Sequence, residues 1–258
     1  MNHTFLGRTL KIGMTLLRIR PAIVLFGDSI TQFGFGVDGG LGWVSLLASD
    51  YTRRADVLNR GFSGYNTNHA LDLVPRVFGQ PHDDGILFCT IFLGANDAAL
   101  PGEPQHVPLD QYEQNLEELV NKIRTTVQSP TDFPIIFLTP PPVYEPRWAA
   151  FLNVDKSTRD NAVTRAYGER VKKVAAKYNC TVVDSWELLQ GDSEDRKKYL
   201  SDGLHLNEEG NRLIHKGLMD AIQKNHPDIA PMTEGEGKYG SSGIPLEEML
   251  WERLLGLK

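Results

Sequence analysis

From residue 21 onward, short runs of apolar residues alternate with longer segments in which apolar and polar positions are mixed. The short runs are rich in Val, Ile, Leu and Phe, and they predict strands at Ala22–Phe26, Asp56–Leu58, Ile86–Leu93, Ile135–Leu138 and Thr181–Val183. These runs lack period-two alternation, which is typical of strands covered on both faces.

The segments between the runs have the spacing of amphipathic helices. Their apolar stripes are Trp43, Leu46, Leu47 and Tyr51; Leu109, Tyr112, Leu116, Leu119, Val120 and Ile123; Val163, Ala166, Tyr167, Val171, Val174 and Ala175; and Leu213, Ile214, Leu218 and Ile222. Asn207 is the predicted N-cap of the last helix, with Glu208 and Glu209 in its first turn. This alternation of strands and helices predicts an α/β fold with a parallel sheet and helices on both faces.

The two ends of the chain differ from this alternating part. Residues 1–20 contain no acidic side chain and predict a basic N-terminal extension, for which targeting to an organelle stays open. Residues 21–225 form the predicted domain. Residues 226–258 begin as a Gly/Pro-rich linker and end in a short amphipathic helix. That helix either packs on its own domain or forms a homodimer contact.

Composition limits the function. With 41% hydrophobic and 23% charged residues, the 258-residue chain has a globular composition, and its longest apolar run is too short to span a bilayer. The net charge of −6 and the lack of a basic block interleaved with aromatic residues argue against nucleic-acid binding. Cys89 and Cys180 each lie in an apolar segment. Such positions predict buried, reduced thiols and a cytoplasmic location.

Polar residues follow the predicted strands at their carboxyl ends, where ligands bind in an open parallel sheet. The segments concerned are Gly27-Asp28-Ser29, Asn59 to Asn66, Gly94-Ala95-Asn96-Asp97, and Asp202-Gly203-Leu204-His205 just before the last helix. Serine, glycine, asparagine and an Asp/His pair therefore meet at one edge of the sheet. Acyl transfer requires each of these groups.

The predicted catalytic residues are Ser29, His205 and Asp202. A serine hydroxyl needs a base to take its proton, and His205 can serve if Asp202, three residues earlier, holds its other ring nitrogen. The N–H groups of Ser29 and Gly64 and the side-chain amide of Asn96 are the predicted oxyanion hole.

Each fragment also has a simpler interpretation. Gly27-Asp28-Ser29 can be an ordinary turn, Asn96 and Asp97 can cap a helix, and Gly64 can mark a positive φ angle. The placement of all the fragments at one sheet edge favours the catalytic interpretation.

The chain resembles the SGNH (GDSL) hydrolases across residues 21–225. The matching blocks are Phe26-Gly27-Asp28-Ser29-Ile30-Thr31, Arg60 to Thr67 with Gly64, Gly94-Ala95-Asn96-Asp97, and Asp202-Gly203-Leu204-His205. Further matches are to the isoamyl-acetate-hydrolysing esterase branch and its plant relatives. They are Ala98-Ala99-Leu100, Gln105-His106-Val107-Pro108, Thr139-Pro140-Pro141-Pro142 and Leu200 to Leu206.

The resemblance implies a three-layer α/β/α, flavodoxin-like SGNH-hydrolase fold with a five-stranded parallel sheet in the order 2-1-3-4-5. It also implies ester hydrolysis by a Ser-His-Asp triad without a cofactor. No metal-binding motif is present in the sequence.

The expected activity is that of a serine esterase acting on a small-molecule, short-chain ester, most simply an acetyl ester. Asp28, Phe33 and Tyr65 are candidate substrate-binding residues, with loop organisation as the competing interpretation for Asp28 and loop packing for the two rings. The alternatives are a carbohydrate acetylesterase, a lysophospholipase or thioesterase of the same family, and a non-catalytic flavodoxin-like binding protein.

Overall fold

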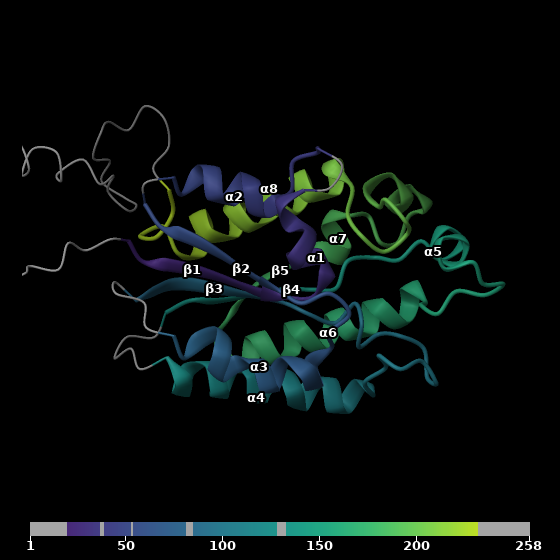
Figure 1. Cartoon of the computed structure of the whole chain (residues 1–258), viewed down its shortest axis with the longest axis horizontal. Coiled ribbons are helices and arrows are strands. Elements are labelled where there is room, and N and C mark those ends of the chain that lie inside the picture. Colours follow the sequence, from purple (N-terminus) through teal and green to yellow (C-terminus); the bar gives the residue numbers. More distant parts are fainter. Residues whose placement is uncertain (1–19, 37–38, 53, 81–84, 128–132, 232–258) are drawn as a thin grey trace, which may run out of the picture.

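The sheet is the one expected from the sequence. The computed structural model describes residues 20–36, 39–52, 54–80, 85–127 and 133–231. Its strands, all parallel, are β1 (Ala22–Gly27), β2 (Asp56–Gly61), β3 (Ile86–Phe92), β4 (Ile135–Leu138) and β5 (Thr181–Val183). The strand order is β2-β1-β3-β4-β5 (Figure 1), which confirms the predicted topology.

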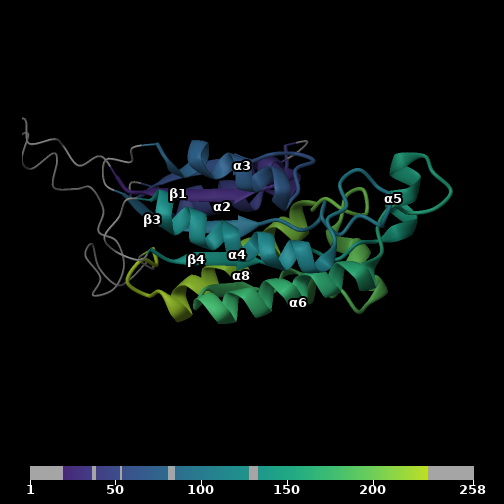
Figure 2. The ribbon, with the colours of Figure 1, turned by 90° about the horizontal axis from the view of Figure 1, so that it is seen from below.

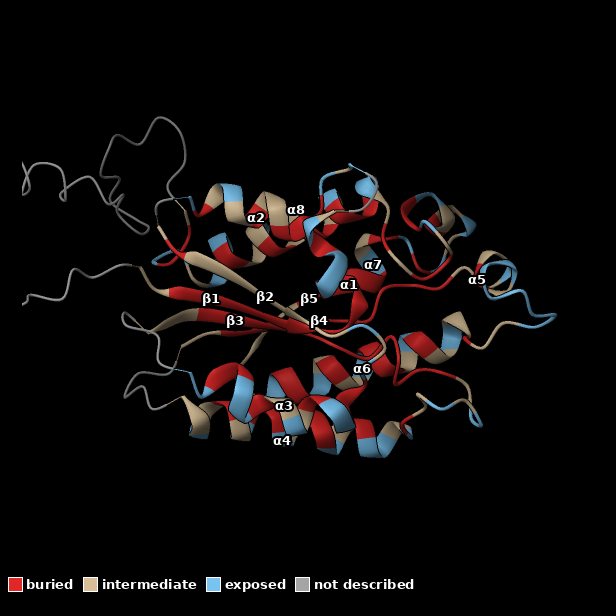
Figure 3. Cartoon of the chain, viewed as in Figure 1, coloured by how far each residue is buried: buried red, intermediate tan, exposed pale blue. Residues whose placement is uncertain are grey.

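The central strand β1 contributes to two hydrophobic cores, one on each face of the sheet. Ile23 and Leu25 pack in one core, and Val24 and Phe26 pack in the other. All six residues of β1 are buried. Figure 3 shows the same pattern around the sheet: the central strands are buried, while the outward sides of the helices are exposed. Burial on both faces explains why these strands lack period-two alternation.

Helices cover both faces of the sheet (Figures 1 and 2). One face carries α2 (Trp43–Asp50) and α8 (Glu208–Asn225). The opposite face carries α3 (Thr67–Phe78), α4 (Leu109–Thr126) and α6 (Asn161–Tyr178). The result is the three-layer α/β/α arrangement expected from the sequence.

The beginnings of the helices follow from their capping residues. The side chain of Asn207 accepts a hydrogen bond from Gly210 N at 3.0 Å, which confirms it as the N-cap of α8. Asp160 caps α6 in the same way through Val163 N at 2.9 Å. The apolar stripes did not reveal α3, which contains Pro75 near its end, although Asn66 and His69 form a capping box at its start.

Short elements cluster at the carboxyl end of the sheet (Figure 1). They are α1 (Ser29–Gln32), a 3₁₀ turn at Phe33–Phe35, α5 (Glu145–Leu152), α7 (Ser185–Leu188) and a second 3₁₀ segment at Glu194–Tyr199. The strands that follow β1 in sequence lie on opposite sides of it, β2 on one side and β3 on the other, so a crevice is expected beyond the carboxyl ends of β1 and β3.

The packed part of the chain continues past residue 225. Ile229 and Ala230 are buried in the core beside α2 and α8, and the carbonyl of Ile229 accepts a hydrogen bond from the Tyr51 hydroxyl at 2.9 Å. The predicted basic extension, apart from Arg20, and the C-terminal helix with its dimer contact lie outside the described residues. No helix in the described ranges is long and apolar enough to cross a membrane.

Candidate active site

The three predicted catalytic side chains form a continuous chain of hydrogen bonds. His205 Nε2 lies 2.8 Å from Ser29 Oγ, and His205 Nδ1 lies 2.6 Å from Asp202 Oδ2. In this arrangement Asp202 holds Nδ1–H, so that Nε2 can accept the serine proton. The structure therefore brings a hydroxyl, an imidazole and a carboxylate into one hydrogen-bonded chain.

The Asp202–His205 pair is built within one tight turn before α8. Asp202 Oδ1 accepts hydrogen bonds from Leu204 N at 2.9 Å and from His205 N at 2.8 Å. Gly203 has a φ of +99°, and a Cβ at this position would lie 2.6 Å from the carbonyl oxygen of Tyr144. The turn therefore requires glycine here.

Asp202 is stabilised in its charged form. Burial alone would raise the pKa of its carboxyl group. The hydrogen bonds from His205 and Leu204, together with the charge of His205, outweigh burial and hold the pKa of Asp202 below its ordinary value. Asp202 is therefore available as a carboxylate at neutral pH.

Ser29 is the first residue of α1, directly after β1. Asp28 is the N-cap of this helix, since its Oδ1 accepts a hydrogen bond from Ile30 N at 2.9 Å. The first N–H groups of a helix have no acceptor within the helix. The position of Ser29 thus leaves its own N–H available to an oxyanion.

The predicted oxyanion residues Gly64 and Asn96 lie on neighbouring loops. Asn96 Nδ2 donates a hydrogen bond to the backbone oxygen of Tyr65 at 2.9 Å, which orients the amide and leaves its second N–H for a ligand. Gly64 has a φ of +81°, a conformation that favours glycine. Asp97 links the two loops, because its Oδ1 accepts a hydrogen bond from Thr67 N at 2.9 Å.

Two buried carboxyl groups flank the site residues. Burial raises the pKa of Asp28 to about 7, opposed by the hydrogen bond from Ile30 and the charge of His205. Burial likewise raises the pKa of Asp97 to about 6. Asp28 is only 1% exposed, and its contacts are those of a helix cap.

A cavity of about 190 Å³ opens beside His205. Its lining residues are Ile30, Phe33, Phe151, Ser201, Asp202, His205, Leu206 and Asn211. Of the three predicted substrate-binding residues, Phe33 lines this cavity, and the lining found in the described chain includes neither Asp28 nor Tyr65. The ring of Tyr65 instead stacks on Phe62, with 5.5 Å between the centroids.

Sequence reasoning missed the contribution of α5 to this region. Trp148 lies edge-on to the His205 ring at 6.1 Å between centroids and stacks on Phe151 at 5.4 Å. Phe151 is 60% exposed, although it is a large apolar residue. Pro146 at the start of α5 is the sequence signal that could have marked this helix, because proline favours the first turn of a helix.

Within the described ranges, no three or more His, Cys, Asp or Glu side chains form a group that could hold a metal ion.

Comparison with known proteins identifies the family. The model of the GDSL-like lipase/acylhydrolase family matches residues 25–213. An isoamyl acetate-hydrolyzing esterase 1 homolog of Mus musculus is 44% identical over 209 residues, which are 79% of this chain and 82% of that protein. A GDSL esterase/lipase of Arabidopsis thaliana is 39% identical over 206 residues, which are 76% of this chain and 83% of the plant protein.

Solved structures share the fold. A lipase/acylhydrolase from Enterococcus faecalis superimposes with a TM-score of 0.62 at 23% identity, covering 83% of this chain and 99% of that one. A catalytic mutant of an acetylxylan esterase from Geobacillus stearothermophilus has a TM-score of 0.59 at 20% identity, with 80% and 96% coverage. The family match and the sequence relatives confirm the enzyme class expected from the sequence, a carboxylic ester hydrolase. The chain thus belongs to the GDSL-like lipase/acylhydrolase family.

Proposed function

We propose that this protein is a serine esterase that hydrolyses small acetyl esters of apolar alcohols. The observation that carries the proposal is the hydrogen-bond chain from Ser29 through His205 to Asp202. A hydroxyl, an imidazole and a carboxylate in this order supply the nucleophile, the base and the orienting group of acyl transfer.

The reaction proceeds in two steps. Ser29 Oγ attacks the ester carbonyl carbon and passes its proton to His205 Nε2, while the N–H groups of Ser29 and Gly64 and the amide of Asn96 bind the oxyanion. The tetrahedral intermediate collapses, and the alcohol leaves with the proton from His205. Water then loses a proton to His205 and attacks the acyl-enzyme, which releases the acid and restores the Ser29 hydroxyl.

The cavity beside His205 suits the alcohol part of the ester. The leaving oxygen must come within hydrogen-bond reach of Nε2, so the group attached to it extends past the imidazole ring. Phe33, whose ring centroid lies 5.8 Å from that of His205, and Phe151 supply apolar walls there. At about 190 Å³, the cavity is smaller than the ~300–1,000 Å³ of pockets for drug-sized ligands.

The acetyl group is supported by similarity. The relative from Mus musculus is named for isoamyl acetate, whose alcohol is a small branched alkyl group. A small apolar cavity fits such an alcohol better than a sugar, because an apolar wall leaves sugar hydroxyls without hydrogen-bond partners.

The test is hydrolysis of p-nitrophenyl acetate by the purified protein and by Ser29→Ala. We expect turnover in the wild type and its loss in the variant, with an unchanged circular dichroism spectrum. Ser63→Ala, which changes an exposed serine near Gly64, is the matched control and should keep full activity. A fluorophosphonate should label the wild type at Ser29, as located by mass spectrometry, and turnover without Ser29 would refute the assignment.

A substrate panel tests the specificity. Isoamyl acetate should give a higher kcat/KM than acetylated xylose, a lysophospholipid or a p-nitrophenyl ester with a long acyl chain. A preference for acetylated xylose would instead identify a carbohydrate acetylesterase.

A further inference from the structure

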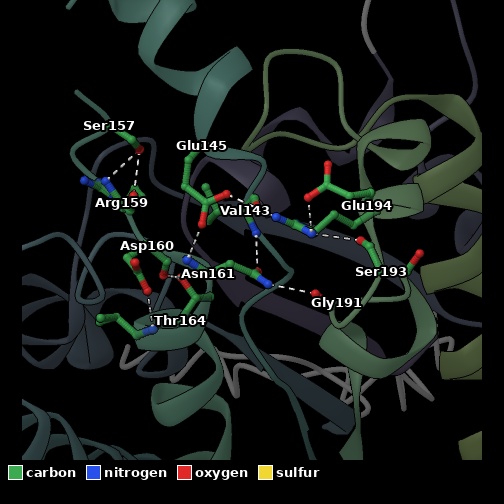
Figure 4. A network of polar contacts seen from close by, with 12 residues as sticks. Val143, Glu145, Ser157, Arg159, Asp160, Asn161, Thr164, Gly191, Ser193 and Glu194 are labelled. Carbon is green, nitrogen blue, oxygen red and sulfur yellow. Dashed lines mark hydrogen bonds and ion pairs between the residues drawn. The ribbon is translucent and has the colours of Figure 1, made fainter. Parts of the chain in front are cut away.

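A buried arginine outside the mechanism lies between α5 and α6. Arg159 is 3% exposed, and its backbone is held by Ser157 on one side and by the helix cap Asp160 on the other. Ser157 Oγ donates to Arg159 O at 2.7 Å and accepts from Arg159 N at 3.1 Å (Figure 4). These local hydrogen bonds therefore fix the backbone from which the Arg159 side chain extends.

The guanidinium group joins the two loops that carry the oxyanion donors. Arg159 Nε donates to the backbone oxygen of Ala95 at 2.9 Å, directly before Asn96 in the chain. Arg159 Nη2 donates to Gln105 Oε1 at 2.6 Å. One planar, rigid group thus contacts the Asn96 loop directly and reaches the Gly64 loop through Gln105.

Gln105 completes the connection to Gly64. Its Nε2 donates to the backbone oxygen of Gly64 at 3.0 Å, and its own backbone oxygen accepts from Asn66 Nδ2 at 3.0 Å. Because both ends of the Gln105 amide are bonded, the amide cannot rotate without breaking a hydrogen bond. The position of the Gly64 peptide is therefore tied to the position of Arg159.

Burial lowers the pKa of Arg159, and the charges of Glu103, Asp28 and Asp97 oppose this lowering, but the direct hydrogen-bond partners of its Nε and Nη2 are neutral. Burying a guanidinium carries a desolvation cost, and an apolar side chain of similar volume often fills such a space at no loss of stability. Arg159 instead directs its donors at a backbone carbonyl and a neutral amide. The fixed fork of the guanidinium determines the distance between these two acceptors.

We infer that Arg159 is a positioning residue that, through Ala95 and Gln105, holds the N–H of Gly64 and the amide of Asn96 at one oxyanion. The inference rests on the proposed esterase function. An oxyanion hole accelerates the reaction only when its donors are already in place, and a displacement of about 1 Å can cost ~10²-fold in rate. Arg159 acts on the transition state through these two loops and does not itself contact the substrate.

The test compares Arg159→Lys and Gln105→Leu with the wild type on p-nitrophenyl acetate. Lysine keeps the positive charge but loses the fork, and leucine removes the connection to Gly64. We expect kcat to fall about 10- to 100-fold in each variant while KM changes less than about 3-fold, because the lost interaction matters mainly in the transition state. Active-site titration with a fluorophosphonate corrects each kcat for the fraction of competent protein.

A second measurement separates positioning from general loss of structure. Phenylboronic acid forms a tetrahedral adduct with a catalytic serine, so its inhibition constant reports on the oxyanion hole. The inhibition constant should rise in Arg159→Lys by the same factor by which kcat/KM falls. In the Gln105→Leu background, Arg159→Lys should lower kcat by a smaller factor than it does in the wild type, because the two residues act through one connection.

The matched control is Arg196→Lys. Arg196 is also buried, at 9% exposure, and donates to the backbone oxygens of Val143 and Ser193 at 2.8 and 2.9 Å. We expect this variant to lose thermal stability and to keep kcat within about 3-fold of the wild type. An equal loss of kcat in Arg196→Lys would overturn the inference.

The possible failures are distinguishable. In one outcome the wild type hydrolyses the ester, and Gln105→Leu and Arg159→Lys keep the wild-type kcat and affinity for the boronic acid. That outcome refutes only the role of Arg159. A wild type without hydrolysis and without fluorophosphonate labelling refutes the esterase function itself. Gln105 is only half-buried, so Gln105→Leu tests the connection even if Arg159→Lys does not fold.

Discussion

His205 Nε2 lies 2.8 Å from Ser29 Oγ, although the two residues are 176 positions apart in the chain. Ser29 follows the central strand β1, and His205 lies in the turn before α8, the last helix described. Because α8 packs on the same face of the sheet as α2, the turn before it returns to the carboxyl end of β1 (Figure 1). The contact between the two side chains is therefore a product of the whole fold.

Asp202→Asn should strongly reduce hydrolysis. In the wild type, Asp202 Oδ2 lies 2.6 Å from His205 Nδ1 and accepts its N–H. An asparagine amide can donate an N–H to Nδ1 instead, which places the imidazole proton on Nε2 and prevents Nε2 from accepting the serine proton. We expect kcat on p-nitrophenyl acetate to fall about 10³- to 10⁴-fold. Asp192→Asn, at an exposed surface position, is the control and should retain its kcat. A loss of less than about 10-fold in Asp202→Asn would contradict the role of Asp202.

Asn96→Ala should lower kcat far more than it raises KM. The free N–H of the Asn96 amide is expected to bind the developing oxyanion, so its loss weakens mainly the transition state. A fall of about 10²- to 10³-fold in kcat is expected from steady-state kinetics. Asn121→Ala, on the exposed side of α4, should leave both constants unchanged. An unchanged kcat would remove Asn96 from the oxyanion hole.

Phe151→Ala should change the preference for the alcohol. With one wall of the cavity shortened, we expect kcat/KM for isoamyl acetate to fall about 10-fold, because each lost methylene contact contributes about 1–3 kcal/mol of discrimination. The value for methyl acetate should change little. Phe35→Ala removes an exposed ring that is not part of the cavity lining in the described chain, and it should affect neither substrate. Equal losses on both substrates would refute the alcohol site.

Asp28→Asn should change how stability depends on pH. Burial raises the pKa of Asp28 to about 7 in the folded protein, whereas the pKa of an aspartate in the unfolded chain is near its ordinary value of 3.8. The folded state therefore holds a proton that the unfolded state has lost, so this stabilisation is complete below pH 3.8 and disappears as the pH rises through about 7.

The measurement is urea unfolding of both proteins at pH 5 and pH 8. Asparagine can still cap α1 but does not titrate. Between pH 5 and pH 8 the free energy of unfolding of the variant should therefore rise by about 2–3 kcal/mol relative to that of the wild type. Asp155→Asn, at an exposed site, should show no such gain. An identical pH profile for Asp28→Asn and wild type would mean that Asp28 is charged when buried.

The sequence by itself determined the strands and the segments that follow them, whereas the order of the strands in the sheet was expected from the family resemblance. Apolar runs such as Ile135–Leu138 are visible because burial on both faces demands continuous hydrophobicity. The Asp202–His205 pair was also predictable, since a spacing of three residues lets the side chains meet within one turn. The helix α3 was not predicted, although the capping box of Asn66 and His69 marks its start and its buried residues Ala70, Val74 and Val77 have helical spacing.

Only the tertiary structure decided which residues surround the candidate catalytic groups. Arg159 contacts Gln105 across 54 positions and Ala95 across 64, and nothing in the local sequence indicates either contact. The cavity likewise depends on the approach of α5 to the turn before α8, which places Phe151 beside His205 and leaves Tyr65 out of the lining found in the described chain. Local patterns report on backbone conformation and burial, whereas the walls of a site depend on how distant loops pack, and that packing has no periodic signature in the chain.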